Sequence, residues 1–310
     1  MKRVTAAKND AGQRIDKFIL KYTKDMPKSL LYKAFRKKRI KVNGKKQEGD
    51  YILKEGDVLD LYINDEFFAE GKKEIRIIKK PQIDIIYEDE NIIVANKPKG
   101  VLMHGEDREN SLVDNLISYL YLKGEYVPEQ EHSFTPAFCN RIDKNTQGLV
   151  IAAKNAQALR EVNEKIKEGK IRKFYLCLLS NVPKAKNGEI ETYLKKDEKQ
   201  NKVFVCKKDE PGAKYAKTKY RVLRETDEGV LTEVELLTGR THQIRVHMSH
   251  IGCPIMGDVK YGAKKDGKNT YQELTAFKLY FDFEADEESV ICNVSKKTFS
   301  ITQKKDEEKY

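Results

Sequence analysis

The sequence predicts an α+β protein in two parts. A small unit of two helices and a sheet precedes a larger unit built on a mixed, mainly antiparallel sheet. The chain has 310 residues, enough for about two domains of roughly 150 residues each. In the larger part, strand-like apolar runs outnumber helical ones and do not alternate with them as βαβ units do. The excess positive charge is confined to the first part.

The net charge of +11 belongs to the N-terminal segment. Residues 1–46 hold 16 lysines and arginines against three acidic residues, whereas residues 81–310 hold 38 against 37. A segment of such density attracts a polyanion and gains affinity by counterion release. Nucleic acid is the natural partner, and a solvated lysine-rich face is the alternative interpretation.

Several classes of protein do not fit the composition. No stretch reaches the roughly 18 apolar residues of a membrane span, and the N-terminus lacks the apolar core of a secretory signal. We therefore expect a cytoplasmic protein. The five cysteines lie at least 29 residues apart, which argues against a thiolate zinc site and a disulfide framework. The sequence also lacks the glycine-rich, P-loop, GxSxG and HExxH motifs.

The basic segment has the pattern of a compact unit over residues 12–64. Apolar positions on one face predict helices over 14–23 and about 28–37, and Pro27 is suited to open the second. An Asn-Gly turn at 43–44 and the run EGDVLDLYI predict a small sheet. The residues expected to face outward and bind RNA are Lys28, Lys33, Arg36, Lys37, Lys38 and Arg39.

Residues 65–80 are charged and aperiodic, which predicts a linker, and the second domain is expected over 81–303. A frayed tail is expected over 304–310. Within the second domain we expect a hairpin from IDIIYED and NIIVANKP, and helices over 111–122 and 156–169. Further strands are predicted at LVIAAKN, FYLCLLS, TKYRVLRE, GVLTEVELL, KLYFDFEA and TFSITQ.

One segment that could carry chemistry is NRIDKNTQGLVIAAKN at 140–155. Arg141 and Asp143 lie two residues apart in a turn-rich stretch before a buried strand, so their side chains share one side of an extended chain. A carboxylate near an arginine in a shielded place suits a nucleophile or a base. An aspartate that merely stabilises a turn is the alternative.

A second segment is LLTGRTHQIRVHMSHIGCPIMGD at 236–258. Arg240, His242, Arg245, His247 and His250 fall within eleven residues. The interleaved arginines would repel a metal cation, whereas their forked donors suit phosphate or carboxylate, so we expect no metal site. A strand-to-helix corner with surface basic residues is the alternative.

Taken together, these segments resemble the RluA-type pseudouridine synthase family, most closely its RluC/RluD branch. The family pattern HRLDxxTSG stands here as NRIDKNTQG at 140–148, with Asn140 in place of His and Gln147 in place of Ser. The pattern GRTHQIRVH is intact at 239–247, and GxPIxGD follows at 252–258. KPxG, KxY and LxA also match, at Lys97–Gly100, Lys173–Tyr175 and Leu274–Ala276.

The N-terminal unit is similar to the S4 RNA-binding domain, which usually precedes the catalytic domain in this branch. The matching pieces are RIDKFI, KSLLYKAFRKKRI, the VNGK turn and the EGD before the last strand. The resemblance therefore covers nearly the whole chain.

The resemblance implies a cofactor-free isomerisation of uridine in RNA to pseudouridine, on a base flipped out of its stack. It assigns the catalytic carboxylate to Asp143 and its basic partner to Arg245. It places Tyr175 against the uracil, as a candidate to remove the C5 proton. The residues that it places at the substrate are Arg141, Leu274, Arg240, His242 and Lys97.

Several functions stay open at this stage. Large-subunit (23S) ribosomal RNA, free or in a pre-50S particle, is the expected substrate, and transfer RNA is the alternative within the same activity. A catalytically decayed RNA-binding assembly factor is a second alternative, although such a protein is expected to have lost Asp143 or Arg245. A nonspecific DNA-binding protein is a third, disfavoured by the nearly neutral second part.

Overall fold

The computed structural model describes residues 1–68, 76–105, 111–265, 271–284 and 287–301. The predicted tail at 304–310 and part of the predicted linker lie outside these residues. The chain forms two compact units. Unit 1 comprises Met1–Pro81, Val113–Ala137 and Ala153–Arg160, and the remaining residues form unit 2. The predicted domain limits stay a prediction, because two later segments group with the N-terminal part.

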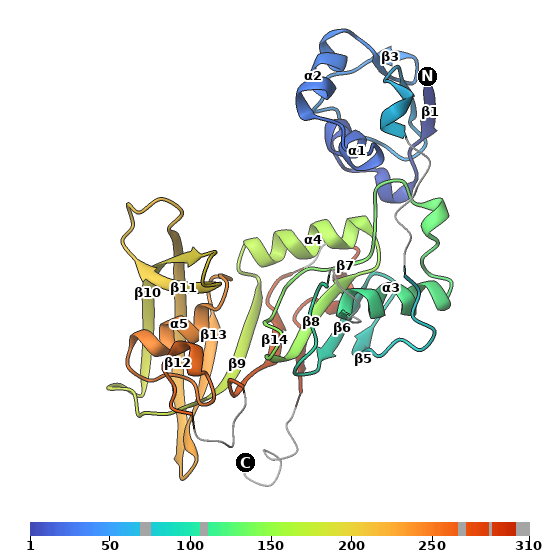
Figure 1. Ribbon diagram of the computed structural model, residues 1–310. Coiled ribbons are helices and arrows are strands. Elements are labelled where there is room, and N and C mark those ends of the chain that lie inside the picture. The colour runs from blue at the N-terminus through green and yellow to red at the C-terminus, as the bar shows by residue number, and fades with distance from the viewer. Residues whose placement is uncertain (69–75, 106–110, 266–270, 285–286, 302–310) are drawn as a thin grey trace. The chain divides into compact units, whose positions relative to one another are not determined.

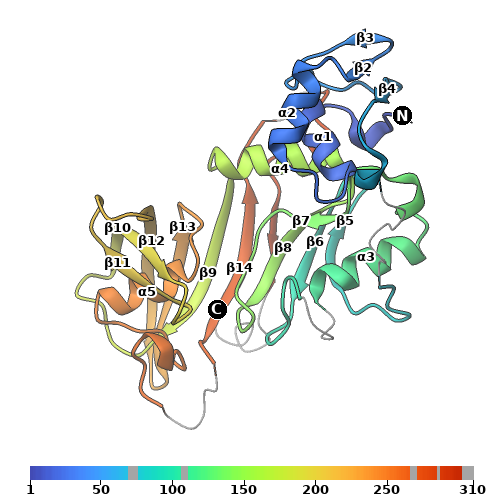
Figure 2. The ribbon, with the colours of Figure 1, turned by 45° about the horizontal axis from the view of Figure 1, so that its top comes forward.

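The N-terminal part of unit 1 contains a helix pair and a small antiparallel sheet (Figure 2). Phe18, Ile19 and Leu31 are fully buried between them. The elements are β1 (Lys2–Thr5), η1 (Lys8–Asp10), α1 (Ile15–Tyr22), α2 (Lys28–Arg36), β2 (Ile40–Val42), β3 (Lys45–Lys46), β4 (Val58–Leu61) and η2 (Asp65–Phe68), with the sheet order β1-β4-β2-β3. Identification of this part as an S4 domain stays a prediction.

The end of α2 turns sharply into β2. Lys38 adopts a left-handed conformation with φ of 59°, and the Arg39 N–H donates to the Ala34 carbonyl at 3.0 Å. This arrangement satisfies a terminal carbonyl of the helix and reverses the chain. The six basic residues expected to bind RNA, from Lys28 to Arg39, are all exposed.

Unit 2 is built on one large, mainly antiparallel sheet (Figure 1), which confirms the predicted fold class. Its order is β11-β10-β12-β13-β9-β14-β8-β6-β5, with β15 paired to β14 and β7 to β8. The bounds are β5 (Asp84–Glu88), β6 (Ile92–Lys97), β7 (Ala137–Phe138), β8 (Gln147–Ala153), β9 (Ile171–Leu179), β10 (Asn187–Asp197), β11 (Lys202–Cys206), β12 (Lys214–Thr226), β13 (Gly229–Leu236), β14 (Leu274–Phe281) and β15 (Thr298–Ser300).

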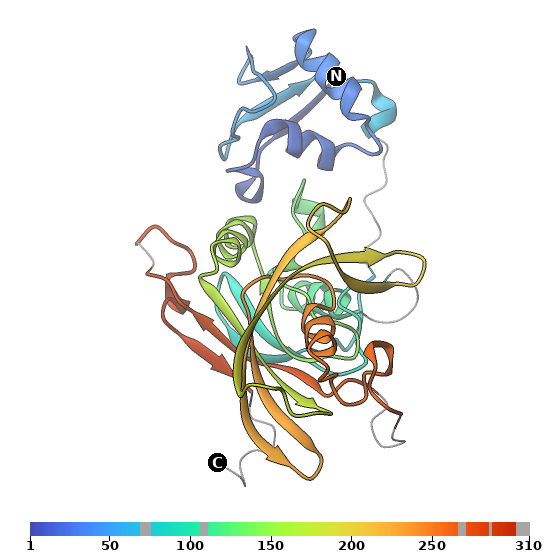
Figure 3. The same cartoon turned by 90° about the vertical axis from the view of Figure 1, so that its left-hand side faces the viewer.

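Three further α-helices follow α1 and α2 in the described part of the chain. The expected helices are present, and none of the described helices is long and apolar enough to cross a membrane. Figure 3 shows the orange helix α5 beside the strongly twisted strands β10 to β13. The helices are α3 (Leu112–Leu122), α4 (Ala156–Lys167) and α5 (Gln243–His250), with the single turns η3 (Pro128–Gln130), η4 (Val259–Tyr261) and η5 (Cys292–Val294).

Strands β10 and β11 were not predicted from the sequence, because they bury few apolar side chains. Only Ile190 and Leu194 of β10 and Val203 of β11 are buried. Five of the eleven residues of β10 are charged, and β11 has only five residues, KVFVC, so neither strand shows the long apolar alternation that marks a strand. Pairing with β12 and packing against α5 nevertheless order this edge of the sheet.

In the middle of the large sheet, strands β8 and β14 approach each other closely at Gly148. Strand β8 runs parallel to β14, with Gly148 opposite Ala276. Gly148 has φ of +129°, and a Cβ atom there would lie 2.2 Å from the Ala276 carbonyl oxygen. Only glycine combines this backbone conformation with so close an approach.

We expect Gly148→Ala to lower the free energy of unfolding by about 3 kcal/mol, because it adds both backbone strain and a clash with β14. Gly169→Ala is the matched control, since Gly169 has φ of +73° but open space around it. It should cost only about 1 kcal/mol. Urea unfolding of both variants measures the difference, and equal losses would contradict the close approach.

Candidate functional site

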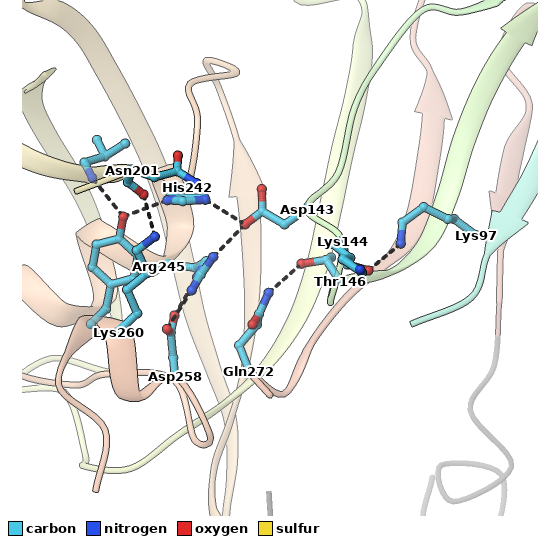
Figure 4. A network of polar contacts seen from close by, with 12 residues as sticks. Lys97, Asp143, Lys144, Thr146, Asn201, His242, Arg245, Asp258, Lys260 and Gln272 are labelled. Carbon is cyan, nitrogen blue, oxygen red and sulfur yellow. Dashed lines mark hydrogen bonds and ion pairs between the residues drawn. The ribbon is translucent and has the colours of Figure 1, made fainter. Parts of the chain in front are cut away.

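The segment before β8 carries Asp143 and is tied to the sheet on both sides. The Asn140 side-chain oxygen accepts from the Ile151 N–H at 2.8 Å, so this position serves to hold the segment against β8. The Thr146 N–H donates to the Asp143 carbonyl at 3.0 Å and closes a turn. The Gln272 amide donates to the Thr146 hydroxyl at 3.3 Å (Figure 4). The backbone around Asp143 is therefore fixed from two directions.

Helix α5 supplies the positive partner of Asp143. Arg245 donates from Nε and Nη2 to the two carboxylate oxygens of Asp258, at 2.7 and 2.8 Å. Its remaining nitrogen, Nη1, donates to Asp143 Oδ2 at 3.0 Å. Figure 4 shows the guanidinium between the two carboxylates. Because the planar group is held at two nitrogens, the direction of the third nitrogen, Nη1, toward Asp143 is fixed as well.

The two carboxylates differ in exposure. The Asp258 side chain is 1% exposed, that of Arg245 is 10% exposed, and that of Asp143 is 27% exposed. Burial opposes the charge of Arg245, but its hydrogen bonds to Asp258 and the two negative charges raise its pKa above the usual value. Asp258 thus holds a permanently charged arginine, and Asp143 is the carboxylate that a ligand can reach.

His242 lies at the start of α5 in a left-handed conformation, with φ of 52°. Its Nδ1 is 2.7 Å from the Tyr261 hydroxyl, and its Nε2 is 3.8 Å from Asp143 Oδ2. Burial lowers the pKa of His242 below its usual range, although the Asp143 charge opposes this shift. The imidazole is therefore neutral near pH 7 and adds no second positive charge beside Asp143.

An apolar wall faces these polar groups. Tyr175 from β9 and Leu274 from β14 are each 5% exposed and, together with Asp143, line a cavity of about 50 Å³. Burial, and next the Asp143 charge, raise the pKa of Tyr175 well above 10. The phenol is thus protonated at neutral pH. The cavity places a carboxylate beside an aromatic ring and an aliphatic side chain.

Most of the residues predicted from the sequence line this one cavity. Arg141 is exposed at its edge. Arg240 lies on the opposite loop, where its Nε donates to the Tyr215 carbonyl at 2.8 Å. The predicted residues that the structure brings together are Arg141, Asp143, Tyr175, Arg240, His242, Arg245 and Leu274.

Lys97 is the exception, and the expectation that it contacts the substrate is corrected here. Its side chain is fully buried, and its ammonium donates to the carbonyls of Pro98, Val101 and Lys144 at 2.8–2.9 Å. Burial lowers its pKa to about 8, which leaves it mainly protonated at neutral pH. All three protons of the Lys97 ammonium are used in these hydrogen bonds. Lys97 therefore supports the loop that follows Asp143.

The other histidines of the segment do not join the site. His247 is fully buried, with its ring nitrogens 2.8 Å from the hydroxyls of Thr192 and Thr218, and burial lowers its pKa to about 4. His250 is exposed at the end of α5. His247 therefore connects α5 to β10 and β12.

Sequence reasoning gave no role to Asp258, Gln243 or Tyr261. Gln243 is buried and accepts from the Arg240 N–H at 3.0 Å while donating to the Lys217 carbonyl at 2.9 Å, so it fixes the loop before α5. The signal for Asp258 was available, because it ends the GxPIxGD motif. Tyr261 carried no such signal. The Tyr261 ring lies against the Arg245 guanidinium, whose central carbon is 4.9 Å from the centroid of the ring.

The chain is similar to several known proteins. A family model described as RNA pseudouridylate synthase matches residues 91–250. The chain is 32% identical over 285 residues to an uncharacterized RNA pseudouridine synthase of Mycoplasma capricolum, covering 91% of this chain and 92% of that relative. It is 33% identical to ribosomal large subunit pseudouridine synthase C of Rickettsia conorii, over 82% of this chain and 84% of that relative.

A solved human structure, RNA Pseudouridylate Synthase Domain Containing 4, superposes with a TM-score of 0.51 and 25% identity. The match covers 63% of this chain and 83% of that one. The likeness agrees with the predicted class of fold.

We expect Lys97→Met to lower the free energy of unfolding by about 3 kcal/mol, because three buried carbonyls lose their donor. Lys99→Met is the matched control two residues away. The Lys99 ammonium makes a partly exposed ion pair with Glu273 at 2.9 Å, so its loss should cost less than about 1 kcal/mol. Urea unfolding measures both, and a small, equal loss would contradict the supporting role of Lys97.

Proposed function

The chain belongs to the RNA pseudouridylate synthase family, and on that premise we propose that it isomerises uridines of large-subunit ribosomal RNA, with Asp143 as the catalytic carboxylate. The observation that carries the proposal is the single partly exposed carboxylate of the cavity. It is oriented by Arg245 at 3.0 Å and faces Tyr175 and Leu274. A fixed carboxylate beside a surface for a flat ring suits chemistry at a nucleoside.

The reaction balances without a co-reactant. The bond between N1 of uracil and C1′ of ribose breaks, the base turns, and C5 bonds to C1′. The proton on C5 leaves and N1 gains a proton, so atoms and electrons are conserved. Asp143 acts as nucleophile or as charge partner of the separated sugar or base. Arg245 keeps the carboxylate aimed at the reacting atoms.

The site needs an extruded base and some adjustment at its edge. A cavity of about 150 Å³ holds a benzene ring, so the cavity of about 50 Å³ cannot enclose a uracil without side-chain movement. Arg141 is exposed at the edge of the cavity. A flipped uridine would displace it, and its guanidinium would then fill the gap that the base leaves in the RNA.

Tyr175 serves as the stacking surface. Since its pKa is raised well above 10, the phenolate needed for removal of the C5 proton is scarce near pH 7. The neutral ring needs no deprotonation to pack against uracil. The expectation that Tyr175 removes the proton is therefore less favoured than its stacking role.

Two features support ribosomal RNA as the substrate. The relative from Rickettsia conorii is named for the large ribosomal subunit. The exposed basic residues of unit 1 provide phosphate contacts that would help to offset the cost of extruding a base. Transfer RNA is the second substrate class. A decayed enzyme is disfavoured, because Asp143 and Arg245 are both present and in contact.

We expect Asp143→Asn to lower turnover at least about a thousandfold while leaving RNA affinity within a few-fold, because the amide keeps the size of the carboxylate and loses its charge. Tritium release from RNA labelled at C5 of uridine measures turnover, and filter binding measures affinity. Unmodified ribosomal RNA and transfer RNA are tested separately.

The control for this variant is Asp282→Asn, at an exposed ion pair with Lys296 in unit 2, which should turn over like the wild type. Near-normal release by Asp143→Asn would contradict the catalytic assignment. Release from transfer RNA alone would contradict the ribosomal substrate.

A further inference from the structure

Unit 1 contains a second cavity, larger than the one at Asp143 and sharing no residue with it. Its volume is about 170 Å³. It lies between α2, the chain just after β4, and the single turn η2. Its floor is apolar and includes Met26, Ala34 and Phe67.

Two large side chains of this cavity are unusually open to solvent. Leu30 on α2 is 40% exposed, and Tyr62 after β4 is 43% exposed. Neither is needed to close the core of unit 1, which is formed by fully buried residues such as Phe18 and Leu31. An exposed aromatic ring beside an apolar cavity provides a flat surface for a ligand.

Three cations surround the same opening. Lys33 and Lys37 are four residues apart on α2, and Arg39 follows the turn at its end. No acidic residue lines the cavity, and within the described part of the chain none of the three cations makes an ion pair. Like charges at this spacing repel one another, so the cluster favours an anionic partner.

The backbone fixes the ring and one cation next to each other. The Tyr62 N–H donates to the Arg39 carbonyl at 2.9 Å, and the left-handed Lys38 sets where the chain leaves α2. The backbone therefore places residues 39 and 62 side by side at one edge of the cavity.

We propose that this cavity binds one unpaired nucleotide of the RNA substrate, with its base against Tyr62 and Leu30 and its phosphates near Lys33, Lys37 and Arg39. The inference rests on the proposed function and adds a second contact point, separate from the reacting uridine. The size fits, because about 150 Å³ holds a benzene ring and a pyrimidine ring is similar. An aromatic platform beside basic residues is how proteins hold single-stranded RNA.

The experiment uses the full-length enzyme and tests the Tyr62 ring and the positive charges in separate variants. Tyr62→Leu removes the stacking ring and keeps an apolar side chain, whereas Tyr62→Phe keeps the ring. Lys37→Gln removes one charge. The matched controls are Tyr121→Leu, at a tyrosine that is 41% exposed on α3, and Lys46→Gln, at an exposed lysine of β3. Neither control residue lines the cavity.

Two measurements are made on unmodified ribosomal RNA. Tritium release gives kcat and KM, and filter binding at several salt concentrations gives affinity and its salt dependence. Tyr62→Leu should raise KM and the dissociation constant about tenfold, with kcat and the salt dependence unchanged. Tyr62→Phe and Tyr121→Leu should stay within twofold of the wild type.

Lys37→Gln should weaken binding and reduce the slope of log affinity against log salt by about 0.7, the value for one phosphate of a single strand. Lys46→Gln should leave the slope closer to that of the wild type. A larger effect of Lys46→Gln than of Lys37→Gln would show that the charges act without the cavity.

The outcomes distinguish this proposal from the proposed function. If the wild type releases tritium but Tyr62→Leu binds RNA like Tyr121→Leu, the cavity proposal is wrong and the catalytic assignment stands. If the wild type releases none from ribosomal RNA, either free or in a pre-50S particle, the catalytic assignment is wrong, and filter binding still decides whether the cavity holds a nucleotide. Equal loss in Tyr62→Leu and Tyr62→Phe would indicate a structural role or a protein ligand, and would also overturn the proposal.

Discussion

The geometry around Asp143 depends on one buried ion pair, that between Arg245 and Asp258. Two hydrogen bonds of 2.7 and 2.8 Å from Nε and Nη2 fix the orientation of the planar guanidinium, and its third nitrogen, Nη1, donates to Asp143. A buried arginine without Asp258 would be costly, since an unpaired charge in the interior destabilises a protein by several kcal/mol. Asp258 thus stabilises the buried charge of Arg245 and also fixes the orientation of the guanidinium toward Asp143.

The rest of unit 2 brings two distant chain segments to this pair. Asp143 comes from the stretch before β8, and Arg245 comes from α5, which is 102 residues later. The parallel contact of β8 with β14 at Gly148 sets the position of the first segment. Lys97 holds the loop after Asp143 through the Lys144 carbonyl. His247 attaches α5 to β10 and β12. Much of the sheet therefore serves to align one carboxylate with one guanidinium.

The residues of the candidate site carry stronger sequence signals than parts of the scaffold do. Asp143 and Arg245 stand in dense motifs, so their pairing could be expected before any coordinates. Lys97 was misplaced because a lysine beside a Pro-Gly turn is normally exposed, and nothing local shows that three carbonyls converge on it. Strand β10 was not predicted because five of its eleven residues are charged, and β11 was not predicted because it has only five residues. Asp258 was visible within a motif, but its bidentate contact exists only in three dimensions.

The role of the Arg245–Asp258 pair can be tested most directly by a double-mutant cycle on turnover, with Arg245→Lys, Asp258→Asn and the double variant. Tritium release from RNA labelled at C5 of uridine gives kcat, and thermal unfolding confirms that each protein is folded. If Asp258 acts through Arg245, the double variant should be no slower than Arg245→Lys alone, within about twofold. Losses that multiply would show that Asp258 affects catalysis independently, and would contradict the central role of the buried pair.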